Sequence, residues 1–473
     1  MRKTAKLISV IIVISVFLSA CQGAQPEVFD VDFAMPDGGT DLEGVTVIYQ
    51  MGIVDALSDK PICLGYIMDT PLGDAAVQRI KDIQTNLNCV LDIRYAYGGN
   101  NSSSFISSSA SGLYLCDAAM GISDMWAEIA RIGMLIGMTE LEEYLDFRNE
   151  AKWGYRNMLE VIYYEDDLYG VAPMLWPEIA VTYDSPIVVN ETMISSLGET
   201  DPRDYLENLQ WNWDTFEECL DRYYVQEGAE IKNYSLTVGL GNFAAMFVLS
   251  NGSKFAEKDA SGKYIPGFFT PNAITAMERA LNIINGPVSH TIDTVTNVAD
   301  ALVGGTTVLG SLSSESIVGS NGRISKEMDN FGIVSWPYGP DVDPGYVAGR
   351  HHNIERCISF SRMSPHPDAA ATVVDALYEP LGGYNDLDSL LDYMSKNYFY
   401  DRRDAEVYYN MYFNSCYSYF HYSGMLGYMQ DWITSNKSIT EYIESTTDMI
   451  TSRIDEYVLP SMRGIDAVWG ENN

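Results

Sequence analysis

The first residue pattern that could support chemistry is Gly239–Ala244, which reads Gly-Leu-Gly-Asn-Phe-Ala and follows the strand-like run Tyr234–Val238. Glycines at this spacing after a strand are typical of a turn that binds the diphosphate of a dinucleotide. Such a site also needs a long helix and then another strand. Only Ala244–Leu249 precedes the break at Ser250–Gly252, which is too short for that crossover. We therefore expect no dinucleotide cofactor.

Other residues of catalytic or metal-binding type lack the required spacing. Gly310–Ser314 misses the closing glycine of the turn that presents a serine nucleophile. His351 and His352 are adjacent, so on an extended chain they point to opposite faces and rarely bind one metal ion. With 65 acidic residues in the chain, carboxylate spacing does not indicate a glycosidase. We expect no catalytic residue, no metal and no cofactor.

Two tryptophans stand in proline-rich segments that favour turns. Trp176 lies within Pro173–Glu178, and Trp336 lies within Val334–Pro340. Sugars present flat C–H faces that stack on indole rings, and their hydroxyl groups need carboxylate or amide partners. The same residues would serve equally well in a packed core. The pattern therefore leaves a sugar contact and a core position both open.

The elements that must position these residues alternate between strand and helix. Val45–Tyr49 is a β-branched run typical of a buried strand, and Cys89–Tyr95 is a second one. Between them a helix with one apolar face opens at Asp74. This order predicts a parallel α/β sheet. Later helices are predicted to open at Asp214, acting as the N-cap, and at Pro271, in the first helical position.

Length and composition restrict the class of protein. The chain has 473 residues, of which 47% are hydrophobic, so two or three lobes with sizeable cores are expected. The formal net charge is −36. A charge of that sign and size repels nucleic acid, so we expect no nucleic-acid partner.

The N-terminus has the features of an export signal. Arg2, Lys3 and Lys6 precede the apolar run Leu7–Leu18, which is too short to span a bilayer. The ending Leu-Ser-Ala-Cys21 resembles the lipobox of bacterial lipoprotein precursors. In that family the cysteine is diacylated and becomes the new N-terminus. The resemblance implies a signal peptide over 1–20, lipidation of Cys21, a flexible tether over 21–41, and a location on the extracellular face of the cell membrane.

The chain resembles the extracellular solute-binding lipoproteins of bacterial ABC importers, a family 1-like class that includes the maltodextrin-binding proteins. Loose motifs of that class occur in the same order along nearly the whole chain. After the lipobox they are Leu168–Pro173 with Val181–Asp184, Asn212–Phe216, Leu249–Gly252 with Gly262–Lys263, Val303–Leu309, Phe331–Pro340, and Ser364–Asp368.

This resemblance implies an α/β, two-lobed periplasmic-binding-protein-like fold, with a cleft between the lobes and a helical C-terminal region. The implied lobes are 42–175 plus 338–378, and 176–337 plus 379–473. A ligand would sit in the cleft, and closure of the lobes would bury it. No bond would be made or broken, so the protein would not be an enzyme.

The resemblance also implies a monomer that captures a small molecule, most simply a sugar, and delivers it to the permease subunits of an ABC transporter. The strand-end tryptophan of maltodextrin binders falls on Gly121 here, and their nearby ligand aspartate falls on Asp124. Motif position gives four candidate ligand-binding residues: Asp124, Glu178, Asn242 and Ser313. Trp176 and Trp336 are two more candidates, because both lie where the chain is predicted to cross between the lobes. A lipoprotein hydrolase of surface glycans and a sensing or adhesion receptor of the same fold are the alternatives.

Overall fold

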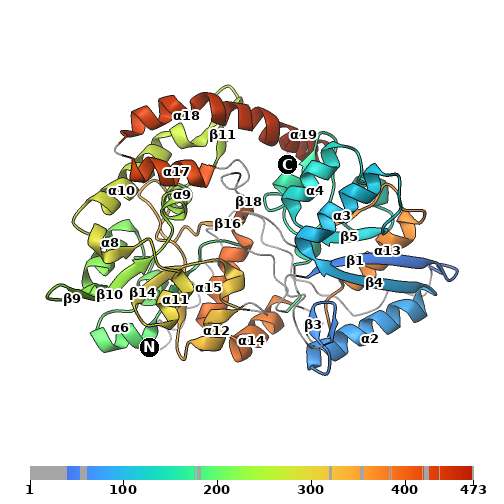
Figure 1. Ribbon diagram of the computed structural model, residues 1–473, viewed down its shortest axis with the longest axis horizontal. Coiled ribbons are helices and arrows are strands. Elements are labelled where there is room, and N and C mark those ends of the chain that lie inside the picture. Colours follow the sequence, from blue (N-terminus) through green and yellow to red (C-terminus); the bar gives the residue numbers. More distant parts are fainter. Residues whose placement is uncertain are drawn as a thin grey trace, which may run out of the picture.

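The computed structural model has two large β-sheets on opposite sides of the molecule, each flanked by helices (Figure 1). We refer to the two halves as the first and second lobes. The structure describes residues 40–53, 61–174, 176–177, 183–318, 322–351, 356–382, 384, 386–417, 419, 425–435 and 437–470.

The sheet of the first lobe has four strands in the order β17-β5-β1-β4. β1 (Thr46–Ile53) pairs in parallel with β4 (Val90–Tyr97) on one side and with β5 (Ala118–Gly121) on the other. β17 (Cys357–Phe360) joins β5 in antiparallel orientation. The predicted strand–helix–strand order at the N-terminus is therefore confirmed, and the fourth strand comes from a distant part of the chain.

The helix between β1 and β4 is α2 (Pro71–Asn86), which begins three residues before the predicted start at Asp74. Thr70 caps it, because its hydroxyl oxygen accepts the Gly73 N–H at 3.1 Å. The other elements of this lobe are β2 (Ile62–Cys63), β3 (Tyr66–Ile67), α3 (Gly98–Ala110), α4 (Ser123–Arg131), η1 (Met138–Leu141), α5 (Glu150–Trp153), η2 (Glu160–Ile162), β6 (Tyr163–Tyr164), β7 (Asp167–Leu168) and α13 (Pro367–Leu377).

The sheet of the second lobe has β13-β10-β14-β8-β15 as its main path. β10 (Glu230–Thr237) pairs in parallel with β13 (Ile292–Asp293) and with β14 (Thr307–Ser311). β8 (Ile187–Val189) runs antiparallel to both β14 and β15 (Gly332–Val334). The short strand β9 (Val225–Glu227) forms a hairpin with β10.

Helix starts in this lobe agree with the sequence in one case and differ in another. Thr270 caps α10 (Pro271–Asn285) with proline in its first turn, as predicted. The cap of α8 (Trp213–Tyr223) is Asn212 rather than Asp214, because the Asn212 side-chain oxygen accepts two backbone N–H groups. The remaining elements are α6 (Glu191–Leu197), α7 (Pro202–Glu207), α9 (Leu240–Ser250), β11 (Ala256–Lys258), β12 (Tyr264–Pro266), η3 (Gly267–Phe269), η4 (Ser289–Thr291), α11 (Val298–Val303), η5 (Ser314–Ser316) and α12 (Arg323–Glu327).

Between residue 40 and α14 the chain passes between the lobes three times: between β7 and β8, between β15 and β17, and between α13 and α14. The C-terminal helices cross between the lobes again. The second passage contains β16 (Gly349–His351), which pairs in parallel with β18 (Ser415–Tyr417) to form a two-stranded ribbon. The exact lobe boundaries given above stay a prediction.

The chain after the third passage is largely helical. Its helices are α14 (Leu387–Asn397), α15 (Arg402–Phe413), α17 (Met425–Thr434), α18 (Ile439–Arg453), the π-helical turn η6 (Ile454–Val458) and α19 (Leu459–Trp469). α17 packs on α9 and α18 contacts α10, whereas α19 packs on β6 and β7 of the first lobe. Among the described helices, none combines the length and apolar character needed to cross a membrane.

Candidate functional site

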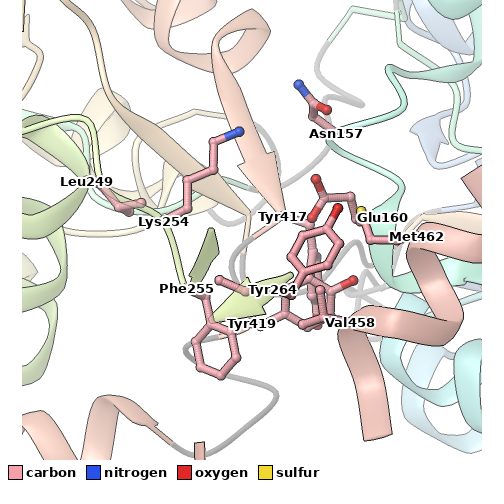
Figure 2. Close-up of a pocket in the computed structure, with 11 residues that line it drawn as sticks. Asn157, Glu160, Leu249, Lys254, Phe255, Tyr264, Tyr417, Tyr419, Val458 and Met462 are labelled. Carbon is pink, nitrogen blue, oxygen red and sulfur yellow. The ribbon is translucent and has the colours of Figure 1, made fainter. Parts of the chain in front are cut away.

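A cavity of about 220 Å³ lies where the two lobes and the C-terminal helices meet (Figure 2). The first lobe contributes Asn157 and Glu160, and the second contributes residues from the end of α9 to β12. The remaining lining comes from β18 and the C-terminal segment. The described residues that line the cavity are Asn157, Glu160, Leu249, Lys254, Phe255, Ala256, Tyr264, Tyr417, Tyr419, Val458 and Met462.

Glu160 is held at the cavity by a short turn. It opens η2, whose other residues, Val161 and Ile162, are buried in the first lobe. The Ser461 hydroxyl donates to the Glu160 carbonyl and fixes the backbone. Within the described part of the chain, the Glu160 carboxyl group has no hydrogen-bond or ion-pair partner. Burial raises the pKa of this carboxyl to about 7, and the positive charge of Lys254 opposes that shift.

Lys254 stands on the opposite wall. α9 ends at Ser250, and the chain turns at Gly252, whose φ of +81° favours glycine. Lys254 follows this turn, and Figure 2 shows its side chain extending toward the side where Asn157 and Glu160 lie. Its ammonium group forms no ion pair with a described residue. A carboxyl and an ammonium group therefore face the same cavity without contacting each other.

Aromatic rings form the rest of the surface. The rings of Tyr417 and Tyr419 meet edge to face at 5.0 Å, and Phe255 lies 5.9 Å from Tyr419. Tyr264 completes the group on β12. Burial, with the negative charge of Glu160 adding to it, raises the pKa of Tyr264 to about 12, so its hydroxyl keeps its proton at neutral pH. The rings offer flat apolar contact, and their hydroxyls offer hydrogen bonds.

The lining of the cavity combines polar groups with aromatic rings. Its polar groups can donate to and accept from several hydroxyls at once, while the tyrosines can pack against a C–H face. Of the described residues that line it, Glu160 is the one carboxylic acid, whereas glycoside hydrolysis normally uses two flanking carboxyl groups. Across the described residues, no group of three or more His, Cys, Asp or Glu side chains is placed to hold a metal ion.

Two of the six sequence-predicted residues contact the ribbon of β16 and β18. Asp124, at the start of α4 in the first lobe, accepts a hydrogen bond from the Tyr417 hydroxyl at 2.8 Å. Asn242, on α9 in the second lobe, accepts one from Arg350 at 2.7 Å. Arg350 is buried, and Asp184 lies 3.1 Å from it. The ribbon thus connects both lobes close to the cavity.

Arg350 itself has unused hydrogen-bonding capacity. Its Nε and Nη1 atoms are buried and have no hydrogen-bond partner among the described residues. Unpaired buried donors are uncommon and usually mark a bound water, a ligand or a change of conformation. We note this group as a polar neighbour of the cavity, because β16 and β18 pair Arg350 with Cys416, next to Tyr417.

The two predicted tryptophans lie in packed interiors rather than on a cleft surface. Each is 1% exposed. The Trp176 ring lies 5.0 Å from that of Tyr378, and its N–H donates to the Glu379 carbonyl at 3.2 Å. Trp336 packs against Phe243 at 5.7 Å and donates to the Ser185 carbonyl at 2.7 Å. This burial favours the core interpretation of both residues, and stacking on a ligand stays a prediction.

The remaining predicted residues have other places. The Ser313 hydroxyl lies 3.2 Å from that of Ser316, across the first turn of η5. Glu178 and Cys21 fall outside the described residues.

Sequence reasoning missed Glu160, although a lone acid in the apolar run Leu159–Ile162 was a usable signal. Lys254 gave no such signal, because exposed lysines are common.

Comparison with protein-family models gives no match, and neither does comparison with curated proteins. Solved structures do match. A cyclic alpha-maltosyl-1,6-maltose binding protein from Arthrobacter globiformis has a TM-score of 0.63 and 13% identity, over 87% of this chain and 100% of that one. A cyclo/maltodextrin-binding protein complexed with maltotetraose has a TM-score of 0.59 and 9% identity, over 90% and 99%.

An ABC substrate-binding protein from Listeria monocytogenes, in complex with cycloalternan, has a TM-score of 0.56 and 11% identity, over 87% of this chain and 100% of that chain. Likeness at such low identity establishes the fold. The chain therefore has the two-lobed, periplasmic-binding-protein-like α/β fold that the sequence predicted, with a helical C-terminal region.

Proposed function

We propose that this protein is the substrate-binding component of an ABC importer, and that it captures a carbohydrate in the cavity between its lobes. The observation that carries the proposal is the cavity itself. Both lobes contribute to it, tyrosine rings supply flat contact, and Glu160 and Lys254 face it without protein partners among the described residues. The matched proteins of this fold are sugar-binding proteins rather than enzymes, which supports the same function.

The mechanism follows from the arrangement. A ligand that contacts both walls interacts more strongly with the closed state than with the open one, so binding shifts the population toward closure. Glu160 can accept hydrogen bonds from hydroxyl groups, and Lys254 can donate to other hydroxyl oxygens. The membrane permease would then recognise the closed state. No chemical step is involved.

A ligand screen tests this function. Thermal unfolding of the protein would be followed with neutral mono- and oligosaccharides, and in parallel with peptides, polyamines and metal ions. We expect a rise in the melting temperature with a carbohydrate, because a ligand that binds only the folded state stabilises it by mass action. A rise with peptides or polyamines and none with carbohydrates would contradict the sugar assignment.

We also propose that Cys21 carries the lipid anchor and places the protein on the extracellular face of the cell membrane. The support is the lipobox resemblance in the sequence. Metabolic labelling with a radioactive fatty acid tests it: the label should enter the wild-type protein and be absent from Cys21→Ser. Equal labelling of both proteins would contradict the anchor without affecting the ligand site.

A further inference from the structure

Residues 439–469 form one uninterrupted helical segment, made of α18, η6 and α19, which we call the strap. Its backbone does not leave the helical region at either junction. Ile454, after α18, has φ −62° and ψ −47°, and Leu459, after η6, has φ −63° and ψ −42°. Two helices that pack on different lobes are therefore joined without a loop between them.

The π-helical turn in the middle of the strap has a cause in the sequence. Pro460 follows η6 within the first turn of α19. Proline inside a helix has no N–H to donate, and its ring clashes with the carbonyl of the residue four positions earlier. A local π-helical turn is one way in which a helix accommodates such a residue, and it marks a point where the helix bends.

One end of the strap belongs to the second lobe. α18 contacts α10 and β12, and its residues Tyr442 and Ile450 are buried. The Tyr442 ring also packs on Trp432 of α17 at 5.4 Å. Figure 1 shows α18 lying over the second lobe and α19 lying beside α4 of the first.

The other end fits closely onto the first lobe. Gly464 of α19 is buried, and a Cβ atom at this position would lie 2.9 Å from the Tyr164 nitrogen and 3.0 Å from the Asp167 oxygen. Any larger residue would collide with the backbone of β6 and β7. The Pro460 carbonyl also accepts the Glu165 N–H at 2.9 Å. The backbone of α19 is thus in direct contact with the backbone of the β6–β7 hairpin.

Side chains reinforce the same contact. Arg463 forms two hydrogen bonds to the Glu165 carboxylate, at 2.6 and 2.7 Å. The Trp469 N–H donates to the Tyr163 hydroxyl at 2.8 Å, and the Arg156 guanidinium lies 4.5 Å from the centre of a Trp469 ring. Together with Gly464, these residues form what we call the α19 seat.

We propose that the strap is a latch across the cleft, and that the α19 seat sets how far the lobes, and hence the cavity, can open. Val458 and Met462 of the strap line the cavity, so the latch also forms one of its walls. The three backbone passages alone would allow hinge motion. A helix fixed to both lobes restricts that motion unless it bends at η6 or leaves the seat.

The test is to loosen the seat without ligand, so that its outcome is independent of the proposed function. Gly464→Val inserts side-chain atoms where the backbones nearly touch. The matched control is Ala467→Val, the same kind of enlargement on the exposed face of α19. Because Gly464→Val could prevent folding, Arg463→Ala/Trp469→Ala serves as a second variant that removes only peripheral contacts. Far-UV circular dichroism confirms that each protein is folded.

Two measurements are made on each folded protein: amide hydrogen exchange over 459–469, and the radius of gyration from small-angle X-ray scattering. We expect faster exchange in α19 and a larger radius in both seat variants, with the control like wild type. Faster exchange with an unchanged radius would overturn the latch. Unchanged exchange in the seat variants would overturn the assignment of the seat.

Discussion

The packing around Trp336 and the interlobe cavity are both rich in aromatic residues, yet they differ in how their polar groups are satisfied. The Trp336 ring is buried against Phe243 and Phe247, and its indole N–H has a carbonyl partner. In the cavity, Glu160 and Lys254 lack partners among the described residues. An aromatic cluster whose polar groups all have hydrogen-bond partners contributes stability. A cluster whose polar groups lack partners retains the capacity to bind a ligand. The predictions below test this contrast.

The largest expected effect comes from Trp336→Ala. Removing a fully buried indole leaves a void in the second lobe, which should lower the free energy of unfolding by about 3–5 kcal/mol. Urea denaturation measures this loss. Calorimetry below the denaturation midpoint should then show near-normal ligand affinity in the remaining folded protein. A tenfold weaker affinity with normal stability would place Trp336 in the ligand site instead.

A buried carboxyl with partners gives the sharpest contrast to Glu160. Asp404 is fully buried, lies 3.0 Å from Arg203, and accepts the Ile333 N–H at 2.7 Å. Burial raises its pKa to about 6, against the lowering effect of Arg203. Arg203 also pairs with Glu191 and Asp201, so Asp404→Asn removes one of its three charge partners and weakens the buried hydrogen bonds there. The free energy of unfolding should therefore fall by about 1–3 kcal/mol. A urea-denaturation midpoint of the Asp404→Asn variant equal to that of wild type would contradict this prediction.

Tyr264 should matter for affinity more than for stability. It is half-buried and lines the cavity, so Tyr264→Ala removes a ring from the proposed contact surface. We expect binding of the sugar found in the screen to weaken by about 1–3 kcal/mol, as aromatic anchors do. Tyr264→Phe is the matched control, because it keeps the ring and loses only the hydroxyl. Equal affinity of Tyr264→Ala and wild type would remove Tyr264 from the site.

The smallest effect concerns the ionisation of Glu160. Its pKa rises from 4.5 to about 7 on folding, so the folded state retains a proton that the unfolded chain has released. The associated stability is complete below pH 4.5 and is lost as the pH rises to about 7. Glu160→Gln cannot ionise. It should match wild type near pH 4 and be more stable near pH 8. The full difference in pKa corresponds to about 3 kcal/mol, and solvent at the partly exposed side chain reduces this to roughly 1–2 kcal/mol.

Thermal unfolding from about pH 4 to 8 measures this difference. Glu278→Gln, on the exposed face of α10, is the control and should follow wild type throughout. A constant offset between Glu160→Gln and wild type over this range would show that the carboxyl does not titrate as burial requires.

The sequence identified the fold because its signals were local or ordered. The β-branched runs, the helix opening at Thr270–Pro271 and the succession of family motifs each depend on short segments. The cap of α8 was misplaced because Asn212 and Asp214 are both good capping residues, and only the backbone geometry selects Asn212. Local chemistry thus gave the elements, with errors of a few residues at their ends.

The candidate site was much harder to predict. Asp124 and Asn242 were predicted from motif position, and both contact the β16–β18 ribbon. Their contact with a ligand stays a prediction. Glu160 and Lys254 come from different lobes, and only the folded chain brings them to one cavity. Trp176 and Trp336, by contrast, were predicted as ligand contacts from the sequence, and the structure buries both. An indole suits a core as well as a sugar, and burial is a property of the tertiary structure.

The central claim is that a carbohydrate binds in the interlobe cavity. The most direct measurement is a crystal structure of the protein grown with the sugar that gives the largest thermal shift. We predict density for a sugar ring against Tyr264 and Tyr417, with hydroxyl groups within hydrogen-bond distance of Glu160 and Lys254. A sugar bound elsewhere on the molecule, with this cavity filled only by water, would contradict the claim.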